Sequence, residues 1–222
     1  MIIFVTNLCI TFGKAGRIGL IRRLFCMVLI GLAYINTKAR VLHSMDTLLY
    51  RQKSGQGCLA ICLAYVGGLK PTLHYERNMI LEGLFAFREN YGLSMAMAFM
   101  KRHGDEYANL HMVLASRTYT RYLVQNSTNS TISVQSGSIS QIIQFGWPMP
   151  YIINIDMHTL GWHEHQPHYI VVLGRTAKML KIMDPWTGQT RRVSRVKLAT
   201  ATRSLKYYIG ICPTVIWLQN KD

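Results

Sequence analysis

The order of hydrophobic and polar residues divides most of the chain into a helical half and a strand half. In the helical half, apolar residues recur every three or four positions, and glycine or proline separates the runs. In the second half, short runs rich in Val, Ile and Tyr lie between polar turns, which is typical of β-strands. Helices followed by a mostly antiparallel sheet predict an α+β fold.

The same pattern predicts the individual elements. Helices are expected over residues 58–66, 73–90 and 94–102, with Ser94 as the N-cap of the third. Residues 106–125 are expected to begin as helix and continue as strand, with no definable boundary. A short helix is expected over residues 139–145. The expected strands are residues 131–135, 150–155, 168–173, 179–183, 189–193 and 207–218.

Length and charge refine this picture. At 222 residues, the chain fits one domain over residues 45–222 with an extension over residues 1–44. The net charge is +15; the extension carries six Lys/Arg and no acid, and the remainder carries 19 basic and 10 acidic residues. Such a balance favours acidic partners such as anionic lipid or an acidic peptide. No nucleic-acid partner is expected, because no RNP, helix-turn-helix or zinc-finger pattern occurs.

The extension contains an apolar run over residues 24–35, preceded by Arg17, Arg22 and Arg23. A membrane-spanning helix needs about twenty apolar residues, so this run is short for that purpose. Three interpretations stay open: an interfacial membrane anchor, a secretion signal, or a true translation start at Met45. A cytoplasmic or membrane-associated location is favoured, and secretion stays open.

The first candidate for chemistry is Cys58. A polar, glycine-rich loop over residues 50–57 leads directly into an apolar helical pattern, and Cys58 stands at the junction. The N-terminus of a helix has unpaired N–H groups and partial positive charge, which favour the reactive thiolate form of a cysteine. Cys58 is therefore the candidate nucleophile; the alternative is a buried structural cysteine. Cys62, one helical turn later, is expected in the core.

Two further candidates lie at the ends of predicted strands. One strand opens on His168, and the next ends on Asp184 before a proline. A hairpin can bring positions sixteen residues apart side by side on adjacent strands. His168 would then act as general base, and Asp184 would fix the tautomer of the imidazole. A cysteine, then a distant histidine, then an acid is the order of a papain-like site.

These residues together resemble the cysteine peptidases that remove double-glycine leaders from bacteriocin precursors (family thirty-nine of the cysteine peptidases) and their stand-alone relatives. Gln52 lies six residues before Cys58, and a second Cys-Leu-Ala begins at Cys62, as in that family. His168 opens a hydrophobic strand, and Asp184 is followed by proline, at the family's spacing. The resemblance implies a papain-like fold, thiol protease activity and a catalytic triad.

The resemblance also implies an oxyanion donor. The side-chain amide of Gln52, with the backbone N–H of Cys58, would stabilise the oxyanion of the tetrahedral intermediate. Gln56 is a rival because it is nearer in sequence. Leu59 stands where the family usually has glycine, so oxyanion geometry or substrate choice is expected to differ.

The sequence therefore predicts a cysteine peptidase that hydrolyses a peptide bond in a leader or other small peptide, without a cofactor. An acyltransferase using the same thiol and a non-catalytic peptide-binding module remain alternatives. Four histidines lie within eleven residues, but no cysteine or acidic ligand completes a usual metal-site spacing, so no metal is expected. The four are His158, His163, His165 and His168.

Overall fold

A computed structural model describes residues 49–86, 90–126 and 130–221. The expectations for residues 1–44 lie outside the described residues. The α-helices are α2 (Cys58–Val66), α3 (Leu73–Ala86), α4 (Tyr91–His103), α5 (Arg117–Asn126), α6 (Ile139–Ile142) and α7 (Arg195–Ser204). The strands are β1 (Tyr107–Leu114), β2 (Ile132–Ser136), β3 (Tyr151–Asp156), β4 (Pro167–Arg175), β5 (Met179–Asp184), β6 (Gln189–Ser194) and β7 (Thr214–Asn220). Two short helical segments, η2 (His158–Leu160) and η3 (Leu205–Ile209), complete this part of the chain.

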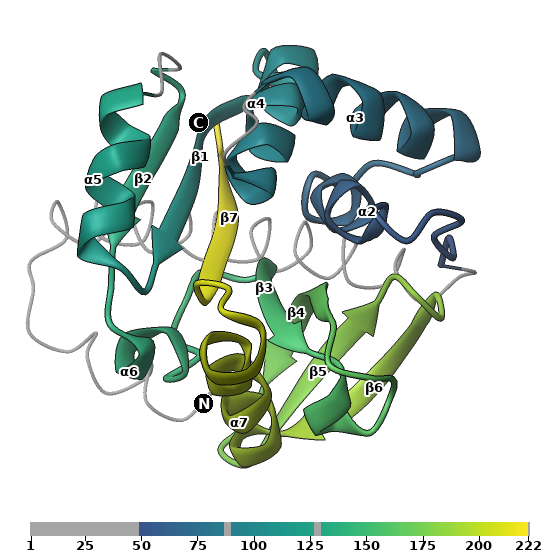
Figure 1. Ribbon diagram of the computed structural model, residues 1–222. Helices are drawn as coiled ribbons and strands as arrows, with labels where there is room; N and C mark the ends of the chain where they lie inside the picture. The colour runs from purple at the N-terminus through teal and green to yellow at the C-terminus, as the bar shows by residue number, and fades with distance from the viewer. Residues whose placement is uncertain (1–48, 87–89, 127–129, 222) are drawn as a thin grey trace, which may run out of the picture. The chain divides into compact units, whose positions relative to one another are not determined.

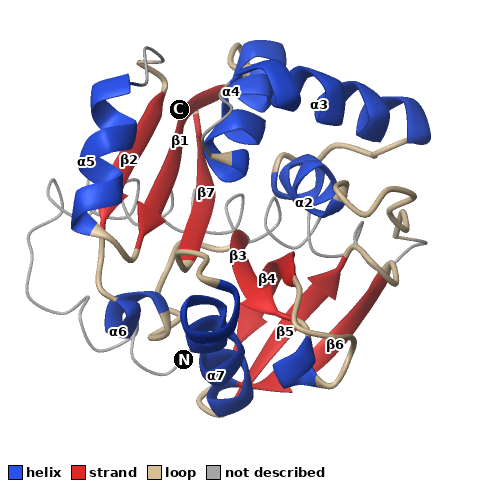
Figure 2. Cartoon of the chain, viewed as in Figure 1, coloured by secondary structure: helices blue, strands red, loops and turns tan. Residues whose placement is uncertain are grey.

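All seven strands belong to one sheet, in the order β2-β1-β7-β3-β4-β5-β6 (Figure 1). Every neighbouring pair is antiparallel except β1 and β2, which are parallel. The mixture of helices and a mostly antiparallel sheet confirms the predicted α+β class (Figure 2). Strands β3 to β6 follow one another in sequence, with η2 in the connection between β3 and β4.

Helix α2 lies between the sheet and helices α3 and α4 (Figure 1). It packs on β4 and also contacts α3 and α4, which pack against each other. All but one of its nine residues are buried, which explains why the pattern at residues 58–66 is apolar on every side. Because it is surrounded in this way, the start of α2 is fixed relative to β4 and β5.

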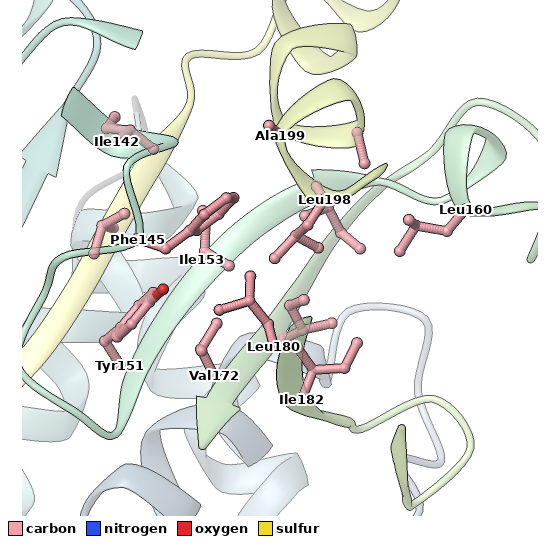
Figure 3. Packing of buried hydrophobic residues seen from close by; sticks show 14 residues of the cluster. Ile142, Phe145, Tyr151, Ile153, Leu160, Val172, Leu180, Ile182, Leu198 and Ala199 are labelled. Carbon is pink, nitrogen blue, oxygen red and sulfur yellow. The ribbon is translucent and has the colours of Figure 1, made fainter. Parts of the chain in front are cut away.

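A hydrophobic core fills the space between the sheet and α7 (Figure 3). Alternate residues of β3, β4 and β5 point into it, among them Ile153, Val172 and Ile182. Leu198 from α7 and Phe145 from the segment after α6 close it. These strands are buried on both faces. Their burial holds β4 and β5 in a fixed register, including the strand ends that carry His168 and Asp184.

The predicted boundaries are right for α2 and close for α6 and for strands β2 to β6. Helix α3 covers the expected range as far as Ala86, where the described residues break. The predicted N-cap at Ser94 is wrong, because α4 begins earlier, at Tyr91. Its cap is Asn90, whose side chain accepts a hydrogen bond from the N–H of Leu93.

Two other predictions are wrong. Residues 107–126 form strand β1 followed by helix α5, the reverse of the expected order. The strand expected over residues 207–218 begins only at Thr214, and helix α7, which was not predicted, precedes it. The start of α7 is capped by Ser194, whose hydroxyl accepts from the N–H of Lys197. None of the described helices has the length and apolar character needed to cross a membrane.

Candidate active site

Cys58 is the first residue of α2, directly after the N-cap position at Gly57. No side chain caps this helix, so the N–H groups of its first turn, including that of Cys58, are not bound by a capping side chain. The helix therefore presents partial positive charge at the thiol. Cys58 is only 6% exposed, and its exposed part borders a groove described below.

His168 and Asp184 meet at one end of the β4–β5 pair. His168 is the second residue of β4, and Asp184 is the last residue of β5. Because the two strands are antiparallel, the start of one lies beside the end of the other. The Nε2 atom of His168 lies 2.8 Å from Oδ1 of Asp184. The Cys58 side chain acts on the same imidazole and raises its pKa, so the ring interacts with both the thiol and the carboxylate.

The Asp184 carboxylate is fixed from several sides. Oδ1 also accepts a hydrogen bond from the N–H of Trp186 at 2.9 Å, and Oδ2 accepts from the hydroxyl of Thr187 at 2.8 Å. Burial by itself raises the pKa of Asp184, but His168 and these donors lower it below its usual value. Asp184 is therefore ionised and fixed in orientation, as is required of a carboxylate that orients an imidazole.

The pKa of His168 is raised to about 9. Burial acts in the opposite direction, because it disfavours the imidazolium. The hydrogen bond to Asp184, the negative charge of that carboxylate and the interaction with the Cys58 side chain outweigh it. At neutral pH the site thus favours an imidazolium placed between two groups that stabilise its positive charge.

Gln52 is buried beside the turn that follows Asp184. Its backbone N–H donates to the carbonyl of Pro185 at 2.8 Å, and its side-chain Nε2 donates to the carbonyl of Ser54 at 2.9 Å. An amide nitrogen has two N–H donors, so one remains for a second acceptor. Gln56, the rival, has an exposed side chain and lines the groove.

Glu76 is a residue that sequence reasoning missed. It lies on α3 and is completely buried, and its carboxylate binds the loop that carries Gln52. Oε1 accepts from the N–H groups of Lys53 and Ser54 at 2.9 and 2.8 Å. Oε2 accepts from the hydroxyl of Tyr50 at 2.8 Å. A buried carboxylate with several donors fixes the conformation of residues 50–54.

The same carboxylate requires glycine at position 57. A Cβ atom on Gly57 would lie 2.0 Å from Oε1 of Glu76, far inside van der Waals contact. The absence of a side chain at Gly57 therefore allows α3 and the loop before Cys58 to approach each other. No spacing in the sequence indicates this contact, because it depends on tertiary packing alone.

A groove of about 810 Å³ opens beside Cys58. One wall contains Tyr91 at the start of α4, and another contains Tyr169 of β4 and the segment from Gly210 to β7. A second cavity of about 240 Å³ is lined by Gln52 and Trp186, among other residues. The groove has the size of a typical ligand site.

Leu59 and Cys62 both point into the core. Leu59 is completely buried and does not line the groove, so its side chain does not occupy the space beside Cys58. Cys62 is completely buried, as predicted, and its thiol donates to the carbonyl of Tyr169 at 3.4 Å. Burial raises the pKa of the Cys62 thiol well above its usual value.

The other three histidines of the sequence cluster do not join the site. The rings of His158 and His165 stack at 4.1 Å between centroids, and Nδ1 of His165 lies 2.9 Å from Oδ2 of Asp156. His163 contacts the ring of Trp186 edge-on. Within the described residues, no three His, Cys, Asp or Glu side chains come together as a metal site would require.

The structure therefore brings Cys58, His168 and Asp184 together, and it attaches Gln52 to the turn after Asp184. A buried carboxylate binds the histidine, the histidine interacts with a cysteine at a helix N-terminus, and a groove opens beside that cysteine. Such an arrangement can generate and use a thiolate nucleophile. No protein-family model matches the chain, and no curated protein matches it.

Proposed function

We propose that this protein is a papain-like cysteine peptidase that hydrolyses a peptide bond with Cys58 as nucleophile. The observation that carries the proposal is the hydrogen-bonded pair of His168 and Asp184, which interacts with the Cys58 side chain beside a groove. A histidine held by a buried carboxylate is common in cores, but the addition of a cysteine at a helix N-terminus makes a nucleophile–base pair.

The geometry assigns the two imidazole nitrogens different roles. Nε2 of His168 faces Asp184, which leaves Nδ1 for the thiol. Nδ1 would hold the proton from Cys58 while the thiolate attacks the carbonyl carbon of the substrate. It would then give that proton to the leaving amine as the C–N bond breaks, leaving a thioester on Cys58. A water molecule, deprotonated by Nδ1, would attack the thioester and release the carboxylic acid.

Gln52 and the backbone N–H of Cys58 would stabilise the oxyanion of both tetrahedral intermediates. Support comes from the buried position of Gln52 and its backbone bond to the residue after Asp184. The Ser54 carbonyl holds one N–H of the amide and orients the second. Glu76 fixes the same loop and would keep the donor in place without touching the substrate.

The test is incubation of the purified protein with a mixture of peptides of varied sequence, followed by mass spectrometry of the products. Cleavage by the wild type and none by Cys58→Ala would support the proposal. Products that carry an added amine or alcohol instead of water would identify an acyltransferase. Retained cleavage in Cys58→Ala, or no reaction of Cys58 with iodoacetamide, would overturn the assignment of the nucleophile.

A further inference from the structure

The charged side chains that line the two cavities beside the site have one sign. Lys206, on η3, is exposed and lines the groove beside Cys58. Arg51 and Lys53 are exposed and line the smaller cavity that contains Gln52 and Trp186. No carboxylate lines either cavity within the described residues.

Within the described residues, no carboxylate neutralises the positive charge at the groove. Lys206 has no carboxylate partner in the described part of the chain. The charge of Lys206 acts on Cys212 in the groove wall. Burial raises the pKa of the Cys212 thiol, and the positive charge of Lys206 lowers it. Glu76, Asp156 and Asp184 are buried, and none of the carboxylates that the structure describes lines the groove.

The remaining groove wall offers neutral groups that can hold a peptide. Tyr91 and Tyr169 supply apolar faces with polar tips, and the amides of Asn90 and Asn154, which are bonded within the protein, add no charge. A groove with such walls and one unpaired cation selects a chain that is mostly neutral and carries a carboxylate near the cation. A basic peptide would meet repulsion at both cavities.

Resting on the proposed peptidase function, we infer that the substrate is an acidic peptide, with carboxylate side chains close to the cleaved bond. One carboxylate pairs with Lys206 in the groove, and another lies near Arg51 and Lys53 on the other side of Gly55, which lines both cavities. The protein's net charge of +15 adds long-range attraction to the same substrates.

The experiment measures binding apart from cleavage. Three fluorescein-labelled peptides share one neutral framework and carry Glu, Gln or Lys at the two flanking positions. Fluorescence anisotropy gives their Kd for the full chain with Cys58→Ala, which leaves the charged residues intact. We expect the Glu peptide to bind more tightly than the Gln peptide and the Lys peptide to bind least, with a preference that shrinks between about 0.05 M and about 0.5 M salt.

Lys206→Gln should reduce the preference for the Glu peptide about two- to five-fold, and Lys206→Glu should reduce it further and improve binding of the Lys peptide. The matched control is Lys197→Glu, an exposed position on α7 that lines neither cavity but changes net charge equally. Equal effects of Lys206→Glu and Lys197→Glu would overturn the inference, as would equal binding of the Glu and Gln peptides or no binding at all. Tight binding of the Glu peptide without cleavage by wild type would instead reject the proposed peptidase function alone.

Discussion

The Nε2 atom of His168 lies 2.8 Å from Oδ1 of Asp184, and both side chains are almost completely buried. In such surroundings an imidazolium is costly unless a negative charge is next to it. The carboxylate supplies that charge, and the Cys58 side chain further raises the pKa of the same ring. The pair therefore determines both which nitrogen faces the sulfur and over which pH range the ring stays protonated.

The first prediction concerns this pH range. The pKa of His168 is about 9, above the usual value of about 6.5. Stabilisation from the folded-state imidazolium is therefore complete below about pH 6.5 and is lost as pH rises through about 9. We expect kcat/KM for peptide hydrolysis and the free energy of unfolding to fall together over this alkaline window. Rate profiles and denaturant titrations at pH 6 to 10 measure both.

Asp184→Asn tests the cause of that shift. The amide removes the negative charge while it keeps a side chain of similar shape, so the alkaline limb should move to lower pH. Cys58→Ala removes the second group that raises the pKa of His168 and should lower it too, which NMR of the imidazole can follow without activity. An alkaline limb at the same pH in wild type and Asp184→Asn would contradict the assigned pair.

The second prediction separates the two cysteines of α2. Cys58→Ala should lower hydrolysis by a factor of about 10⁴ or more, because it removes the proposed nucleophile. Cys62→Ala should retain most activity and lose between about 0.5 and 3 kcal/mol of stability, because Cys62 is fully buried in the core. Iodoacetamide followed by peptide mapping should label Cys58 before Cys62. An inactive Cys62→Ala that is folded would show that the register assigned to the helix is wrong.

The positions of Cys58, His168 and Asp184 could be predicted because each lies at the end of an element with a strong local pattern. The glycine-rich loop before an apolar run marks the start of α2. A β-branched run after His168 and the proline after Asp184 mark the two strand ends. Once both strands are assigned, their antiparallel pairing places the histidine near the acid.

Other features could not be predicted because local pattern does not determine them. Residues 107–114 are apolar enough for helix or strand, and their pairing with β7, about a hundred residues later, decides the outcome. Helix α7 is short and rich in basic and small residues, and its burial on β3 stabilises it. Glu76 acts through a contact between α3 and a loop some twenty residues earlier.

The third prediction tests the oxyanion donor. Gln52→Ala should lower kcat by about 10² to 10³ with a smaller effect on KM, because the donor acts on the charge that develops in the transition state. The comparison variant is Gln56→Ala, whose exposed side chain lines the groove and should affect KM more than kcat. If Gln56→Ala were the variant with the large loss in kcat, the donor would be Gln56.

The last prediction concerns the contact between Gly57 and Glu76. An alanine at position 57 would place a methyl group 2.0 Å from Oε1 of Glu76, so either the carboxylate or the loop must move. Overpacking of this kind costs about 1–3 kcal/mol, and a displaced carboxylate would leave the N–H groups of Lys53 and Ser54 unpaired. Gly57→Ala should therefore lower both the free energy of unfolding and kcat.

Gly55→Ala is the matched control for stability, because no atom lies within 4 Å of its added Cβ. Its free energy of unfolding, measured by denaturant titration, should stay within about 0.5 kcal/mol of wild type. Glu76→Gln offers the complementary test: it relieves no clash but replaces one acceptor by an N–H₂ group that faces backbone donors. A Glu76→Gln protein as stable and as active as wild type would show that this carboxylate does not hold the loop in place.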